Sequence, residues 1–391
     1  MTTNNPSNVL FRLKKVKSLF SKGTSRHKSS ITGIVLLCCI LFLTIFGAVM
    51  VYSASMYSAK RTYGNEYFFL FKQIIGIVLG LFCLILMSKV DYNKLSKYAF
   101  PLLLVSFVLL LLVFIPGIGV ENYGARRWLR LPGTTIQPSE IAKFSFVLFA
   151  SSYLSKHSAS VKHFGTLIPV LLAGLMTCLL IFLEPNMSIT ICVGLLLVTM
   201  LFVGGLSFRH FVLLAIPALI GLPLLVLMEP YRLLRLLAFI NPWASPKGEG
   251  YQLIQSLFSI SSGGLLGVGL FNSRQKYLFL PFAESDFIFS IIAEELGLLG
   301  SLIILAIYFA IIVCGIKIAL SAKDRFGCYL ASGITAVIAI QTLLNIAVVT
   351  GLVPPTGLPL PFISAGSTSL VVFMSAIGVV LNVNKQSKSR V

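Results

Sequence analysis

Long apolar runs alternate with short polar connections along most of this chain. Each run comes close to the roughly 20 residues that an α-helix needs to cross a bilayer. The runs lie at about 31–53, 67–88, 98–117, 138–155, 165–183, 187–206, 209–228, 287–314, 327–350 and 363–383. The pattern predicts an all-α polytopic membrane protein with ten transmembrane helices. Its largest connection, residues 229–286, follows the seventh helix and is expected to lie outside the cytoplasm.

The composition supports this class of protein. Of 391 residues, 57% are hydrophobic and only 11% are charged, and the mean hydropathy is +0.94. A basic tail, residues 1–30, precedes the first apolar run without a small-residue cleavage site, so that run is expected to remain as a span. The membrane domain then covers residues 31–384, and a short tail, residues 385–391, follows it.

Basic residues indicate the orientation, because ten spans place both termini on one side of the membrane. If that side is the cytoplasm, it holds 19 of the 31 lysines and arginines, as the positive-inside bias requires. The net charge of +19 is therefore interpreted as a signal of topology and of contact with anionic lipid. No nucleic-acid-binding pattern accompanies it, so nucleic acid is not an expected partner.

Histidine and cysteine are excluded from the expected chemistry. All four histidines fall on the cytoplasmic side, so reactions on the opposite face must depend on carboxylates, lysine, arginine and backbone groups. The seven cysteines lie in or near apolar runs without CxxC or metal-ligand spacing, which is typical of small buried hydrophobic residues.

Asp286 is the most informative candidate for catalysis. It lies in RQKYLFLPFAESDFIFSIIAEELG, where a loop enters an apolar helix, and a carboxylate at the edge of hydrocarbon is costly to keep. The chain has only two other aspartates, Asp91 and Asp324, and both lie in short basic connections. Arg274 and Lys276 bring positive charge within about ten residues of Asp286, to keep it ionised and to hold a diphosphate. The alternative is that they are ordinary solvated loop charges.

Further cations lie where topology does not require them. Arg126 and Arg127 belong to the outer loop 117–137, and planar guanidinium groups bind phosphate through two hydrogen bonds at once. Pairing with phospholipid headgroups or nearby glutamates is an equal alternative. Glu140 and Lys143 lie three residues apart on one predicted helix, either as a structural ion pair or as a substrate contact. Lys72, near the start of the second span, has the same two interpretations.

The outer loops contain their own predicted elements. Residues 231–240 are amphipathic and suit a helix on the membrane surface, and residues 252–260 suggest a second short helix. No strand is predicted and no GxxxxGK[ST] occurs, so a nucleotide loop is excluded. The segment 351–362, rich in proline and glycine, is predicted to form a cavity wall opposite Asp286, and Ser364 just beyond it is a candidate substrate contact. A functional role for Glu184 is left open.

The chain resembles the SEDS family (shape, elongation, division and sporulation), and its division branch more than its elongation branch. The resemblance rests on GARRW, QPSEIAKF, GYQLIQSLFSISSGGLLGVGLFNSRQK, LPFAESDFIF, AEELG and PPTGLPLPFISAG, in that order. It implies a ten-helix bundle in the bacterial cytoplasmic membrane, with the family's catalytic aspartate at Asp286. Departures occur at Asn186, Phe282, Glu284-Ser285 and Gly366-Ser367, so accessory roles are not carried over to these positions.

The resemblance also implies an activity and partners. We expect a peptidoglycan glycosyltransferase at the division septum that polymerises lipid II, an undecaprenyl-pyrophosphate disaccharide-pentapeptide, with a class B penicillin-binding protein and other division proteins. Asp286 would act as general base in an inverting transfer, and Arg126, Arg127, Arg274 or Lys276 would stabilise the leaving pyrophosphate. No cofactor is required by the sequence, and a divalent cation, Mg²⁺ or Mn²⁺, is left open. The alternatives are a lipid II flippase and a non-enzymatic scaffold.

Overall fold

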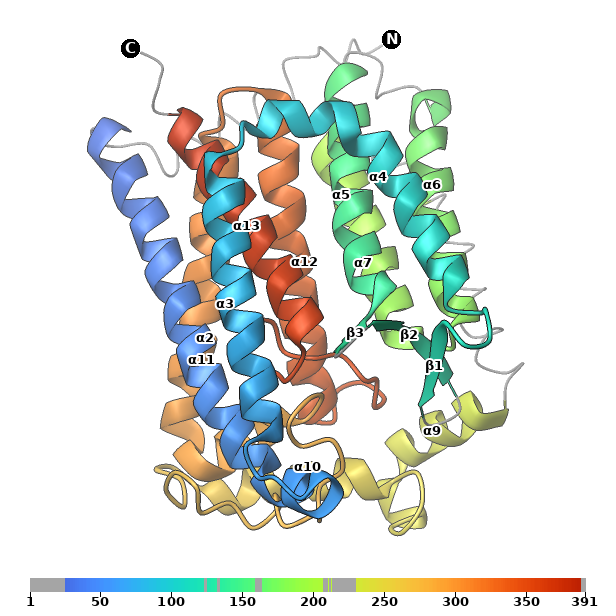
Figure 1. The fold of residues 1–391 in the computed structure, drawn as a ribbon, viewed down its shortest axis with the longest axis vertical. Coiled ribbons are helices and arrows are strands. Elements are labelled where there is room, and N and C mark those ends of the chain that lie inside the picture. The colour runs from blue at the N-terminus through green and yellow to red at the C-terminus, as the bar shows by residue number, and fades with distance from the viewer. Residues whose placement is uncertain are drawn as a thin grey trace.

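The computed structural model describes residues 25–122, 125–131, 134–158, 164–206, 210, 212 and 230–387. Within these ranges the chain is a bundle of long helices with a small sheet and two short helices at one end (Figure 1). The long helices are α2 (Ser25–Tyr63), α3 (Phe68–Lys89), α4 (Tyr92–Leu112), α5 (Pro138–Lys156), α6 (Phe164–Leu183), α7 (Met187–Gly204), α11 (Ile288–Leu320), α12 (Arg325–Val349) and α13 (Ser367–Ser387).

Eight helices within the described ranges are long and apolar enough to cross a membrane, namely all of the long helices except α5. Helix α5 nevertheless lies inside the bundle and has buried charged residues. The buried polar residues of α5 therefore contact other parts of the protein and not solvent. The predicted span 209–228 lies almost entirely outside the described residues, so the count of ten helices stays a prediction.

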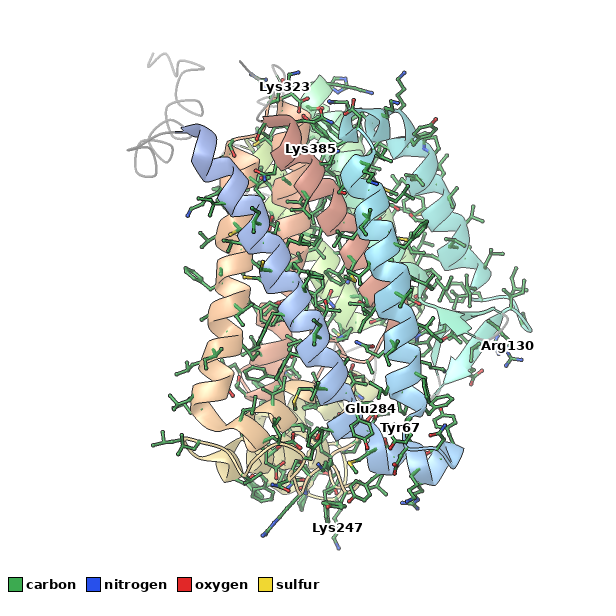
Figure 2. All side chains as sticks on the ribbon, turned by 60° about the vertical axis from the view of Figure 1, so that its left-hand side comes forward. Tyr67, Arg130, Lys247, Glu284, Lys323 and Lys385 are labelled. Atoms are coloured by element: carbon green, nitrogen blue, oxygen red, sulfur yellow. The ribbon has the colours of Figure 1, made fainter. Side chains whose placement is uncertain are left out.

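The two ends of the bundle differ in chemistry. Helix α2 begins and α13 finishes at the same end, whereas the sheet, α9 (Pro230–Ile240) and α10 (Tyr251–Gly263) lie at the opposite end (Figure 1). We call this opposite end the loop end. Figure 2 shows Lys323 and Lys385 at the first end, and Tyr67, Lys247 and Glu284 at the loop end. Both short helices were expected from the sequence, at 231–240 and 252–260, and both predictions are confirmed.

The loop that follows α4 folds as an antiparallel sheet, which the sequence did not predict. Its strands are β1 (Gly119–Asn122), β2 (Ala125–Leu131) and β3 (Thr134–Ile136), in the order β1-β2-β3. The register pairs Val120 with Trp128 and Arg130 with Thr135. Strands of three to seven residues contain too little alternation to be recognised from the sequence, and their cross-strand hydrogen bonds stabilise them.

Glycines allow the loop end to dock onto α11. Helix α11 is interrupted at Gly297, whose φ of +67° is left-handed, and the segment 264–269 lies against the interruption. Val268 donates its backbone N–H to the Glu294 carbonyl (3.0 Å), and Leu298 donates to the Gly264 carbonyl (2.9 Å). A Cβ at Gly267 would lie 2.2 Å from the Glu295 carbonyl oxygen, so the two backbones approach too closely for any side chain.

Candidate active site

A cavity of about 610 Å³ opens among the elements of the loop end. Its walls come from α3, β2, β3, α9, α10, the turn before α11 and the segment between α12 and α13. The lining side chains that matter for chemistry are Lys72, Gln73, Arg127, Trp128, Asn186, Arg235, Gln252, Ser285, Asp286 and Thr356. Elements that are distant in the sequence therefore meet around one space, which is typical of a binding site.

Asp286 lies in the turn that leads into α11 and lines this cavity. Its side chain is half-buried, and burial raises the pKa of the carboxyl from 3.8 to about 6. The positive charges of Arg127 and Arg235 lower this pKa, and so does a hydrogen bond from Ser285. The negative charge of Glu284 raises it. A carboxylate with a pKa near 6 is still ionised at neutral pH and is a stronger base than an exposed aspartate.

Three cations line the cavity together with Asp286: Lys72 from α3, Arg127 from β2 and Arg235 from α9. Arg127 is anchored because its guanidinium donates to the main-chain carbonyls of Glu184 (3.4 Å from Nε) and Pro185. Arg235 lies 3.5 Å from the Glu249 carboxylate and donates to the Pro355 carbonyl (3.5 Å). Among the described lining residues, three positive side chains thus face one carboxylate, so the cavity favours an anionic ligand.

The segment 351–362 forms the wall next to Asp286, which confirms the prediction made from its prolines and glycines. Pro355, Thr356, Gly357 and Pro359 all line the cavity. The approach to Asp286 is close, because a Cβ at Gly357 would lie 2.7 Å from the Asp286 Oδ2 atom. The wall therefore covers one side of the carboxylate, and the other side is open to the cavity.

Glu140 and Lys143 form the ion pair that their spacing predicts. Lys143 Nζ lies 2.9 Å from Glu140 Oε1, and both side chains are fully buried. Lys143 also donates to Gln341 Oε1, and Glu140 accepts a hydrogen bond from Ser369 Oγ (3.1 Å). Neither member lines the cavity, whereas Ser369 does. The geometry favours the structural interpretation, in which the pair braces α5 against α12 and α13.

Neither Arg274 nor Lys276 lines the cavity with Asp286, and the expectation that the charge of Lys276 serves Asp286 is wrong because Lys276 is paired elsewhere. Lys276 Nζ pairs with Glu295 Oε1 (3.2 Å) and donates to Ser53 Oγ (3.3 Å), and Arg274 donates its backbone N–H to Glu294 (2.9 Å). The carboxylates of the AEELG motif at the start of α11 are closer partners than Asp286 is. We call the group Ser53, Ser273, Lys276, Glu294 and Glu295 the buried clasp.

Two other candidates also lie outside the lining of the cavity. Arg126 forms an exposed ion pair with Glu121 (3.1 Å) on the sheet, next to Arg127 in sequence but on the other face of the strand. Ser364 accepts a hydrogen bond from the Leu360 N–H (2.7 Å) and donates to the Ser285 carbonyl (2.5 Å). Ser364 thereby joins the wall segment to the turn that holds Asp286, which is a structural contact.

Sequence reasoning missed several residues of the cavity. The sequence places Arg235 in the amphipathic segment 231–240 and Gln252 at the start of the second short helix without a role in binding, and it gives no signal for Gln73. Asn186 was set aside because it departs from a family pattern, yet it lines the cavity. The polar face of residues 231–240 was the available signal for Arg235. Nothing in the sequence indicated which cavity that face would line.

The donor set of the cavity does not form a metal centre by itself. The described residues contain no cluster of three His, Cys, Asp or Glu side chains that could hold a metal ion, and Asp286 is the one carboxylate among the described lining residues. Nearby, burial raises the pKa of Glu184 to about 8, against the opposing effect of Arg127, so this acid is mostly neutral. The predictions about a cofactor and a divalent cation stay predictions.

Comparison with known sequences identifies close relatives along almost the whole chain. A family described as "Cell cycle protein", whose name joins FtsW, RodA and SpoVE, matches residues 34–389. The probable peptidoglycan glycosyltransferase FtsW of Geobacter metallireducens is 42% identical over 358 residues, which cover 91% of this chain and 95% of that protein. Stage V sporulation protein E of Bacillus subtilis is 40% identical over 351 residues, which cover 89% and 95% of the two chains.

Solved structures share the same arrangement of helices. A chain of a peptidoglycan synthase complex, described as coordinating polymerization and crosslinking, superposes with a TM-score of 0.75 at 27% identity. The match covers 90% of this chain and 98% of that chain. The rod shape determining protein RodA of Thermus thermophilus superposes with a TM-score of 0.66 at 26% identity, over 90% and 96% of the two chains.

Proposed function

The chain belongs to the family of the cell cycle proteins FtsW, RodA and SpoVE, and we propose that it is a peptidoglycan glycosyltransferase of the division machinery. Its substrate is lipid II, which it polymerises into β-1,4 glycan strands on the extracytoplasmic face of the cytoplasmic membrane. In this orientation the loop end faces outward and both termini lie in the cytoplasm. The names of the relatives support the activity and the reaction class.

The observation that carries the proposal is the cavity that Asp286 lines together with three cations, of which Arg127 and Arg235 act on its carboxyl electrostatically. A glycosyl donor linked to a lipid diphosphate needs a positively charged site for its leaving group and a base for the attacking hydroxyl. Lys72, Arg127 and Arg235 supply the first requirement, and Asp286 supplies the second. The cations come from the start of α3, from β2 and from α9, at the loop end of the bundle (Figure 1), where a lipid headgroup would enter from the membrane.

The transfer inverts the configuration at the anomeric carbon, because an α-linked donor becomes a β-linked glycan. Asp286 takes the proton of the acceptor 4-hydroxyl while that oxygen forms the new bond to the anomeric carbon. The bond from the anomeric carbon to the diphosphate oxygen breaks, and the diphosphate leaves with both bonding electrons. The guanidinium groups of Arg127 and Arg235 and the Lys72 ammonium offset the charge that develops on it.

A transpeptidase partner accompanies this activity. The superposed chain comes from a synthase complex that couples polymerization to crosslinking, so a penicillin-binding protein is the partner expected here as well. Membrane association follows from the apolar helices of the bundle. Recruitment to the septum with other division proteins is part of the proposal and is supported by the relatives named FtsW.

Labelled lipid II tests the proposal directly. The purified protein in liposomes, with a cognate transpeptidase, is expected to produce glycan chains, and Asp286→Ala is expected to produce none. Glu284→Gln is the matched control, because Glu284 precedes Asp286 by two residues but does not line the cavity. Chains from the Asp286→Ala variant would refute the assignment of the base. Lipid II that crosses the liposome membrane without being polymerised by wild type would favour a flippase.

A further inference from the structure

One buried amide connects the two segments that enclose the carboxylate of Asp286. Asn345 lies on α12 and is 1% exposed. Its Nδ2 atom donates to the main-chain carbonyl of Asp286 (2.8 Å) and to the main-chain carbonyl of Leu358 (2.6 Å). Leu358 directly follows Gly357, where the wall approaches the Asp286 carboxylate. This side chain bonds to Asp286 itself and to the wall, and it adds to the link that Ser364 makes between Leu360 and Ser285.

The chemistry of the site requires an amide at this position. Two carbonyl oxygens are both acceptors, so only a group with two N–H donors can satisfy them together. An aspartate would bring its own acceptors toward them, and a leucine of similar shape would have no donor. The Oδ1 atom of Asn345 is buried and has no hydrogen-bond partner among the described residues. Such an atom costs about 1–3 kcal/mol, so the side chain is placed for its donors at some expense in stability.

A second amide one helical turn earlier holds the same wall. Gln341 donates from Nε2 to the Pro359 carbonyl (2.8 Å), and its Oε1 accepts the hydrogen bond from Lys143. Lys143 is paired with Glu140 on α5. The wall at 358–359 is thus fixed to α12 twice, and through Gln341 it is connected to the buried ion pair. Only Asn345 reaches across to Asp286.

We propose that Asn345 is a positioning residue for the glycosyl transfer: it holds the main chain of Asp286 at a set distance from the wall at Gly357 and Leu358. The inference rests on the proposed function, since it assigns to Asn345 the placement of the base. It differs from a purely structural role, because the two hydrogen bonds act on the segments that enclose the reacting group. Displacing a catalytic group by about 1 Å costs a rate factor of about 100.

The experiment compares Asn345→Leu with Asn382→Leu in the full-length protein. Asn382 is a matched control, since it is 3% exposed and also joins two main-chain groups: it donates to the Ser88 carbonyl (2.9 Å) and accepts from the Tyr92 N–H (3.1 Å). It lies on α13 near Lys385, at the end opposite the cavity (Figure 2). Both variants lose two hydrogen bonds between a buried amide and the main chain, and Asn382→Leu also loses one from Gln386 (2.9 Å), so both are expected to lower the Tm.

The two variants are expected to differ in catalysis. Asn345→Leu should lower kcat for lipid II polymerisation by about tenfold to hundredfold, with KM changed by less than about threefold, because the cations that bind the diphosphate are untouched. Asn382→Leu should keep both constants near wild type per folded molecule. Equal kcat values for the two variants would overturn the inference, and a change confined to KM would do the same.

Hydrogen–deuterium exchange gives a readout that does not depend on activity. Asn345→Leu should accelerate exchange in peptides covering residues 282–287 and 356–365, whereas Asn382→Leu should leave these peptides unchanged. Unchanged exchange in the Asn345 variant would overturn the inference even if the enzyme polymerises lipid II. No polymer from wild type would instead refute the proposed function, so the two failures are distinguishable.

Discussion

The cavity and the buried clasp have the same kinds of charged residue and use them in opposite ways. In the clasp, Lys276 and Glu295 are both fully buried and lie 3.2 Å apart. Hydroxyl groups complete the arrangement, because Ser53 donates to Glu295 (2.6 Å) and Ser273 donates to Glu294 (2.6 Å). In the cavity, three cations are spread over three elements around Asp286, with open volume between them.

The difference shows what separates a structural charge from a functional one in this protein. Buried charges without partners are costly, so the clasp pairs Lys276 with Glu295 and surrounds the Glu294 carboxylate with hydroxyl and backbone N–H donors. In the cavity, Arg127 is anchored by the main-chain carbonyls of Glu184 and Pro185. Three cations share the lining with one carboxylate, Asp286. A ligand that carries negative charge is complementary to such a lining.

The largest effect is expected from Asp286→Asn, which preserves the size of the side chain but removes the base. Polymerisation should fall by about 10³-fold or more, in the range associated with loss of a general base. The stability of the folded protein should not decrease. Since burial raises the pKa of Asp286 from 3.8 to about 6, ionisation of the carboxyl costs stability that is lost between about pH 4 and 6 and stays lost above pH 6, so the variant should have an equal or higher Tm at pH 7.5. A lower Tm together with lost activity would point to a structural role instead.

Lys276→Met should damage the fold more than any change of a cavity cation. It leaves the Glu295 carboxylate buried without its cation, which costs about 3–5 kcal/mol. The expected result is a marked loss of Tm and of folded yield in detergent. Lys276→Met combined with Glu295→Gln removes both charges and should recover part of the Tm. A single variant with the Tm of wild type and lost activity would place Lys276 in the reaction.

Arg127→Gln should weaken substrate binding without unfolding the protein. A charge-assisted hydrogen bond contributes about 1.5–3 kcal/mol, so kcat/KM for lipid II should fall by about 10- to 100-fold. Arg126→Gln is the control from the adjacent position, because Arg126 forms an exposed pair with Glu121 on the sheet. It should change kcat/KM by less than about twofold. Equal losses in the two variants would mean that the sheet as a whole, and not Arg127, contributes the effect.

The pH dependence of the wild type gives a smaller effect with a definite sign. Asp286 must be ionised to accept a proton, and its pKa in the fold is raised to about 6. Activity should therefore be constant above about pH 7 and fall about tenfold per pH unit below 6. The profile of kcat/KM between pH 5 and 8 tests this. A midpoint of the kcat/KM profile near pH 4 would show that the Asp286 carboxyl is exposed to solvent in the active enzyme.

The clasp and the cavity also show that residues close in sequence can belong to different sites. Lys276 precedes Asp286 by ten residues, and the segment between them consists of turns. The short separation in sequence therefore predicts that Lys276 lies close to Asp286, but in the fold Lys276 pairs with Glu295 instead. Gly357 and Asn345 lie more than 50 residues beyond Asp286 and yet contact it. Contacts of this kind depend on how the helices pack, and no local pattern indicates them.

The sequence by itself determined the membrane class, eight of the apolar spans, the two short helices of the loop end and Asp286 as the candidate base. These follow from hydropathy, helical periodicity and the high cost of a charge in hydrocarbon, all of which act locally along the chain. Only the tertiary structure decided which cations face Asp286 and which are paired and buried, because that depends on the packing of distant helices. It placed Arg235 in the cavity, Lys276 in the clasp and Asn345 between Asp286 and its wall.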